Sequence, residues 1–165
     1  MSFERQLEIV DELLREAARM ESGEQSRAGR RLPGGYEREL RLAGLAQRIA
    51  QSYTIIEGVL AYVARRIDRT PVTGEDWHKK LISRSAQGFD HPTRPAVISA
   101  ALANDLLELC EFRHVVRNIY PTRLDGSAVR ANLRRLIRAT RSFSGEFRVF
   151  VSALPPERKS LRWRS

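Results

Sequence analysis

The sequence lacks almost every feature typical of secreted or membrane proteins. It has one cysteine in 165 residues, Cys110, which excludes an internal disulfide and a cysteine-based zinc site. No apolar run approaches the roughly 18 to 20 residues that a membrane span requires, and the N-terminus is charged from Glu4 onward. The single cysteine and the lack of long apolar runs lead us to expect a cytoplasmic chain without signal peptide or membrane contact. The sequence also has no glycine-rich phosphate loop, and we expect neither a metal nor a cofactor.

Lysine is scarce, with 3 lysines against 26 arginines, and acidic residues become scarce towards the C-terminus. Residues 1–112 carry 16 basic and 17 acidic side chains, whereas residues 113–165 carry 13 and 3. Such a basic segment is typical of nucleic-acid binding, because cationic side chains that contact phosphates release counterions. An acidic partner protein, or a solvated basic helix face in an arginine-rich chain, would leave the same pattern.

Apolar residues recur at steps of three and four, and no segment alternates apolar and polar residues as a strand would. The pattern predicts helices over about 3–21, 36–69, 96–119 and 127–153, and a short helix over about 73–85. Each long segment has one apolar stripe, which favours an all-α fold: an antiparallel bundle of four main helices plus one short helix. We expect one domain over residues 1–154, with a loop at 22–35 and a basic tail at 155–165.

The polar residues of greatest interest lie near the end of the fourth predicted helix. Arg113, Arg117 and Tyr120 share one face, because steps of four and seven return to within about 40° of the start. Two guanidiniums beside a phenol can bind a phosphate, although an exposed basic stripe with Tyr120 closing the bundle end has the same spacing. His114 and Asn118 are four residues apart, and histidine is the usual acid or base for a ribose 2′-hydroxyl. A single histidine on a helix is more often a surface or packing residue.

The segment from Phe112 to Tyr120 resembles the HEPN superfamily of small helical ribonucleases, and particularly the HepT-like toxins encoded beside a minimal nucleotidyltransferase antitoxin. The motif there is Arg, four to six residues, His and often a Tyr two positions later, with a polar residue after the Arg. Arg113, His114 and Tyr120 match it, whereas Asn118 stands where the His belongs. Residues 53–57, 74–81 and 94–99 also resemble HepT-like sequences, in the same order.

The resemblance implies the toxin of a type VII-like pair, a metal-independent RNA endonuclease that acts on RNA, tRNA included. Its site would lie in a composite cleft of a homodimer or higher oligomer, with Arg113 on the scissile phosphate and Arg117 and His114 contacting the RNA. The family His assists proton transfer, and Asn118 cannot do so near neutral pH, so the resemblance leaves open whether this chain is active or inactive as an enzyme. The antitoxin would silence the site by adenylylating Tyr120.

Three explanations of Asn118 stay open: natural loss of cleavage, a change made to disarm a toxin, or a swap in which His114 takes over. The swap requires a distorted helix end near Pro121. The alternative to a ribonuclease toxin is a non-catalytic helical adaptor that binds nucleic acid or an acidic partner protein.

The remaining conspicuous side chains are interpreted as structural. Trp77 is expected to dock the short helix, His78 to lie on the surface and Cys110 to lie in the core. Arg84 and His91 satisfy the count of the motif, but a loop separates them, so we regard that match as accidental.

Overall fold

A computed structural model of the chain describes residues 2–26, 35–90, 93–118 and 124–159. Its helices are α1 (Phe3–Gln25), α2 (Tyr36–Arg66), α3 (Trp77–Ser85), α4 (Ala100–Asn118), α5 (Gly126–Ala153) and α6 (Pro156–Lys159). Two short strands, β1 (Phe89–Asp90) and β2 (Thr93–Arg94), pair antiparallel between α3 and α4. The predicted all-α bundle is confirmed, and the strand pair is a small addition to it.

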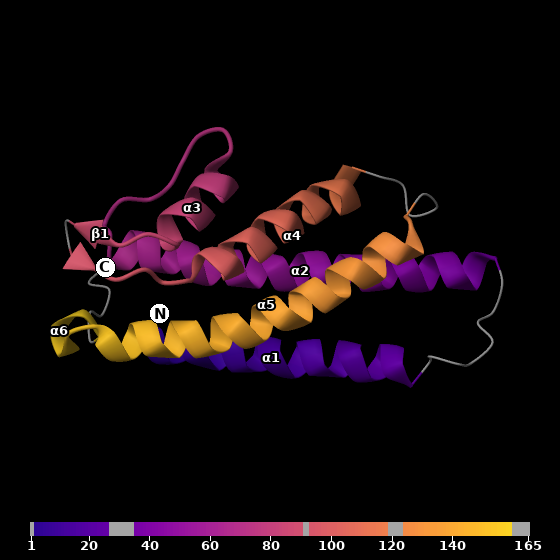
Figure 1. Cartoon of the computed structure of the whole chain (residues 1–165), viewed down its shortest axis with the longest axis horizontal. Coiled ribbons are helices and arrows are strands. Elements are labelled where there is room, and N and C mark those ends of the chain that lie inside the picture. Colours follow the sequence, from indigo (N-terminus) through magenta and orange to yellow (C-terminus); the bar gives the residue numbers. More distant parts are fainter. Residues whose placement is uncertain (1, 27–34, 91–92, 119–123, 160–165) are drawn as a thin grey trace.

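The long helices lie lengthwise against one another, with α2 running through most of the molecule (Figure 1). Helices α1 and α5 lie side by side, while α3 and α4 pack on α2 from the other side (Figure 1). Helix α2 can contact all of them because its apolar residues recur every three or four positions and form a buried stripe. That stripe consists of Ile49, Tyr53, Ile56, Leu60, Val63 and Ile67.

Several predicted helix boundaries are wrong; α4, for example, begins at Ala100 and not directly after Pro95. The short helix begins at Trp77 and not near Thr73, because Asp76 adopts a left-handed backbone (φ 57°), which interrupts a right-handed helix. Helix α1 continues to Gln25 and so enters the predicted loop. The predicted tail contains the single turn of α6.

The start of α4 is fixed to α5 by one side chain. Ser99 Oγ accepts from the backbone N–H of Leu102 at 3.2 Å, the arrangement of an N-cap residue. The Glu146 carboxylate on α5 accepts from the Ser99 backbone N–H at 2.6 Å and from its hydroxyl at 2.8 Å. This contact sets where α4 begins and therefore where its later residues lie.

A buried ion-pair cluster joins the end of α2 to the segment between α3 and α4. Asp68 accepts hydrogen bonds from Arg94 at 2.5 and 2.9 Å and from Arg84 at 2.8 and 2.9 Å. The Asp68 and Arg94 side chains are each only 1% exposed. Arg94 also donates to the carbonyls of Gln87 and Pro95, so both charges are compensated. Arg84 is thus structural, as expected, while His91 lies outside the described residues.

Several arginines of α5 form ion pairs with carboxylates of neighbouring helices. Arg138 pairs with Asp105 on α4 at 2.6 Å, Arg141 pairs with Glu21 on α1 at 2.6 Å, and Arg148 pairs with Asp11 on α1. Part of the C-terminal basic excess is therefore neutralised by carboxylates of other helices.

None of the helices in the described ranges is sufficiently long and apolar to span a membrane.

Candidate functional site

Arg113 on α4 points inward, towards α2 and α3. Its Nη1 lies 3.5 Å from Nε2 of His78 and 3.9 Å from a carboxylate oxygen of Glu57. Its guanidinium carbon lies 6.0 Å from the centre of the Tyr53 ring. The Arg113 side chain is 12% exposed, so this cation is largely removed from water and yet reaches the surface.

The carboxylate of Glu57 holds this arrangement together from α2. Tyr53 and Glu57 are one helical turn apart on the buried face of α2, and the Tyr53 hydroxyl donates to Glu57 at 3.0 Å. Nδ1 of His78 lies 2.5 Å from the same carboxylate oxygen. Glu57 is 5% exposed, and a buried carboxylate of this kind requires such donors.

His78 reaches the site from the start of α3. Its side chain is 16% exposed, so the prediction of a surface histidine is wrong. The error has a physical reason: the left-handed Asp76 makes Trp77 and His78 the first residues of α3, next to α2. The Trp77 and His78 rings are 3.9 Å apart between centroids, and Trp77 packs against the core as expected.

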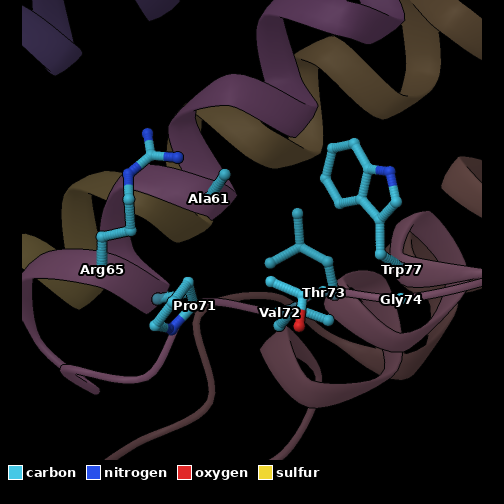
Figure 2. Close-up of a pocket in the computed structure, with 9 residues that line it drawn as sticks. Ala61, Arg65, Pro71, Val72, Thr73, Gly74 and Trp77 are labelled. Atoms are coloured by element: carbon cyan, nitrogen blue, oxygen red, sulfur yellow. The ribbon is translucent and has the colours of Figure 1, made fainter.

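A pocket of about 420 Å³ opens on the other side of Trp77, between α2 and residues 71–74 (Figure 2). Its lining is mostly apolar and includes Ala61, Val72 and Leu81, while Arg65 lies across the pocket from Trp77 (Figure 2). Trp77 therefore contacts both this apolar pocket, which it lines, and His78 of the polar group around Arg113.

His114 and Cys110 complete the polar group on α4. Nε2 of His114 lies 3.8 Å from Sγ of Cys110, and the His114 ring centre lies 5.8 Å from that of His78. Burial raises the pKa of the Cys110 thiol and of the Tyr53 phenol, so both keep their protons at neutral pH. Cys110 is fully buried, as expected of a core residue. We call Tyr53, Glu57, His78, Arg113 and His114 the Arg113 cluster.

The other predicted site residues lie outside this cluster. Arg117 and Asn118 are exposed at the end of α4. Within the described residues neither Arg117 nor Asn118 has a side-chain hydrogen bond or ion pair, so the contact that the four-residue spacing of His114 and Asn118 allows is not formed there. Tyr120 lies outside the described residues. Helix α4 extends to Asn118, while Pro121, near which the swap of His114 for the family His requires a distorted helix end, also lies outside the described residues.

An exposed ion pair lies at the edge of the Arg113 cluster. Lys79 Nζ lies 2.6 Å from a carboxylate oxygen of Glu111, which joins α3 to α4. The hydrogen bond from Lys79 lowers the pKa of the Glu111 carboxyl. In the part of the chain that the structure describes, no group of three His, Cys, Asp or Glu side chains is arranged to hold a metal ion.

Sequence reasoning missed Glu57 and misplaced His78. The signal for Glu57 was present: it lies on the apolar stripe of α2, one turn after Tyr53 and three residues before Leu60. A carboxylate on a buried stripe requires a cation or several donors, so a partner on another helix could have been sought. His78 carries no comparable signal, since one histidine at a helix start is usually solvated.

Comparison with known protein families gives a match for residues 44–154. This segment, which includes the whole Arg113 cluster, matches the family model described as HepT-like protein. Neither the curated proteins nor the solved structures include a match. A match to this family indicates a toxin of a toxin–antitoxin pair. Because the match covers more than half of the sequence, this chain belongs to the HepT-like family.

Proposed function

We propose that this chain is the toxin of a type VII-like pair and that it is a metal-independent RNA endonuclease whose site lies at Arg113. The observation that supports this best is the placement of Arg113 itself. Its guanidinium is held between a buried carboxylate and an imidazole and still reaches the surface, where it can bind an RNA phosphate.

Arg113 would bind the scissile phosphate and stabilise the negative charge that develops on it during cleavage. Arg117, exposed about one turn further along α4, would add a second phosphate contact. Asn118 can donate and accept hydrogen bonds and so orient the RNA, but it cannot exchange a proton near neutral pH. The chain would therefore cleave slowly.

Two parts of the proposal follow from family membership. The site would be completed by a second copy, in a homodimer or higher oligomer, so that motif residues of both subunits contact one RNA. The cognate minimal nucleotidyltransferase antitoxin would adenylylate Tyr120. A bulky anionic group there would block RNA by steric hindrance and by repulsion of its phosphates.

The test is fragment production from total cellular RNA in EDTA, with the protein in excess over RNA. We expect slow cleavage by the chain, and loss of that cleavage in Arg113→Ala, because the phosphate loses its cation. Arg65→Ala is the matched control: this arginine lies at the apolar pocket beyond Trp77, and its loss should leave fragment formation unchanged.

A non-catalytic adaptor is the second candidate, and Asn118 is the observation that favours it. An adaptor would retain RNA or an acidic partner protein without producing fragments. If neither the chain nor Asn118→His produces fragments in EDTA, the endonuclease proposal is contradicted and the adaptor takes its place.

A further inference from the structure

His78 occupies a position that the motif does not assign, because it comes from α3 and not from α4. We propose that His78, oriented by Glu57, accepts the proton of the RNA 2′-hydroxyl at the Arg113 site. This inference rests on the proposed function, and it accounts for how a chain with Asn118 could still cleave RNA. In this chain His78 would be a catalytic residue and Glu57 a positioning residue.

The hydrogen bond to Glu57 determines which nitrogen of His78 carries the lone pair. Nδ1 lies 2.5 Å from the Glu57 carboxylate, which only accepts hydrogen bonds when ionised, so Nδ1 carries the proton. The lone pair is then on Nε2, which accepts a long hydrogen bond of 3.5 Å from Nη1 of Arg113; a phosphate that binds this guanidinium would take over that donor and release Nε2. A carboxylate that holds an imidazole in one tautomer, and stabilises it once protonated, is the arrangement found in catalytic triads. The buried Tyr53 hydroxyl donates to the same carboxylate and fixes its orientation.

Nε2 of His78 faces the predicted phosphate-binding group. It lies 3.5 Å from Nη1 of Arg113, so a phosphate bound to that guanidinium would bring its ribose within reach of Nε2. Both side chains are partly exposed, at 16% and 12%, which leaves them access to a ligand.

His114 is less well placed for the same task. Its Nε2 lies 3.8 Å from Sγ of Cys110, and no carboxylate holds its ring among the residues that the structure describes. The sequence left open that His114 takes over the role of the family His. We assign that role to His78 instead.

The proposed step balances without an external reactant other than water. Nε2 of His78 takes the 2′-hydroxyl proton, the 2′ oxygen bonds to phosphorus, and the bond from phosphorus to the 5′ oxygen breaks. The 5′ oxygen takes a proton from water, and His78 releases its proton to solvent. The products are a 2′,3′-cyclic phosphate and a 5′-hydroxyl end.

The experiment compares the parent chain with His78→Ala in single-turnover cleavage of total RNA in EDTA, with and without added imidazole. We expect His78→Ala to lose about 10²- to 10⁴-fold in rate, the usual contribution of a general base, and imidazole to restore part of it. Imidazole rescue separates proton transfer from a structural role, because a misfolded site would not respond to it. Lys80→Ala, an exposed residue on the same helix, should leave the rate unchanged.

Three results would overturn the assignment of His78. These are a loss smaller than tenfold, a larger loss that imidazole does not reverse, and absence of cleavage by the parent chain. In the last case Asn118→His decides separately whether the proposed function survives, since that variant supplies its own proton-transfer group.

Discussion

Asn118→His should raise the rate of RNA cleavage in EDTA by about 10²- to 10⁴-fold over the parent chain, the usual contribution of one general acid or base. The physical reason is that Asn118 lies exposed on α4, just over one turn beyond Arg113, where an imidazole could exchange protons with RNA. If His78 takes the 2′-hydroxyl proton, the introduced imidazole can protonate the leaving 5′ oxygen. Single-turnover rates on total RNA measure the gain.

Asn118→Gln is the matched control, because it keeps the amide but supplies no exchangeable proton near neutral pH. It should cleave no faster than the parent. Equal acceleration by both substitutions would show that size or flexibility at this position limits the rate, and a proton-transfer role would be wrong.

Asp68→Asn should lower the free energy of unfolding by about 3 to 5 kcal/mol, the usual cost of removing one partner from a buried ion pair. The substitution keeps the side-chain volume but removes the anion that Arg94 faces, and both side chains are 1% exposed. Arg84 loses its carboxylate as well. Equilibrium urea denaturation followed by circular dichroism measures the change.

Asp105→Asn provides the comparison, because Asp105 also pairs with two arginines, Arg138 and Arg135, but water reaches all three side chains, which are 20%, 60% and 26% exposed. Ion pairs that water reaches contribute less than buried ones, so this variant should lose clearly less stability than Asp68→Asn. If Asp68→Asn were no more destabilising than Asp105→Asn, burial would not be what makes the Asp68 cluster important.

The helical bundle could be predicted from the sequence because apolar periodicity indicates its helices and proline indicates where helices end. The apolar stripe of α2 and the position of Pro71 after it are visible in the residues alone. What periodicity could not show is the left-handed Asp76, because apolar spacing carries no information on a single residue's φ, and this backbone is uncommon outside glycine. That single residue moves the start of α3 and determines where Trp77 and His78 point.

Two of the five residues of the Arg113 cluster could be predicted from spacing as well. Arg113 and His114 could be found because the motif lies within one helix, where spacing determines which residues are neighbours. Their partners Glu57 and His78 come from two other helices, and contacts between helices depend on packing that spacing does not encode. The basic C-terminal third was also ambiguous from sequence, since its pairs with Asp11 and Glu21 form only in the folded bundle.

The central claim is that RNA cleavage takes place at Arg113, and the most direct test uses Asn118→His as the reference. We would measure the rate of RNA fragment formation in EDTA for this variant and for the same variant with Arg113→Ala added. We expect rapid fragment formation by the first protein and loss of it in the second, with both proteins still folded at the assay temperature, as checked by circular dichroism. Equal rates in the two proteins would contradict the account, because the chemistry would then lie elsewhere in the chain.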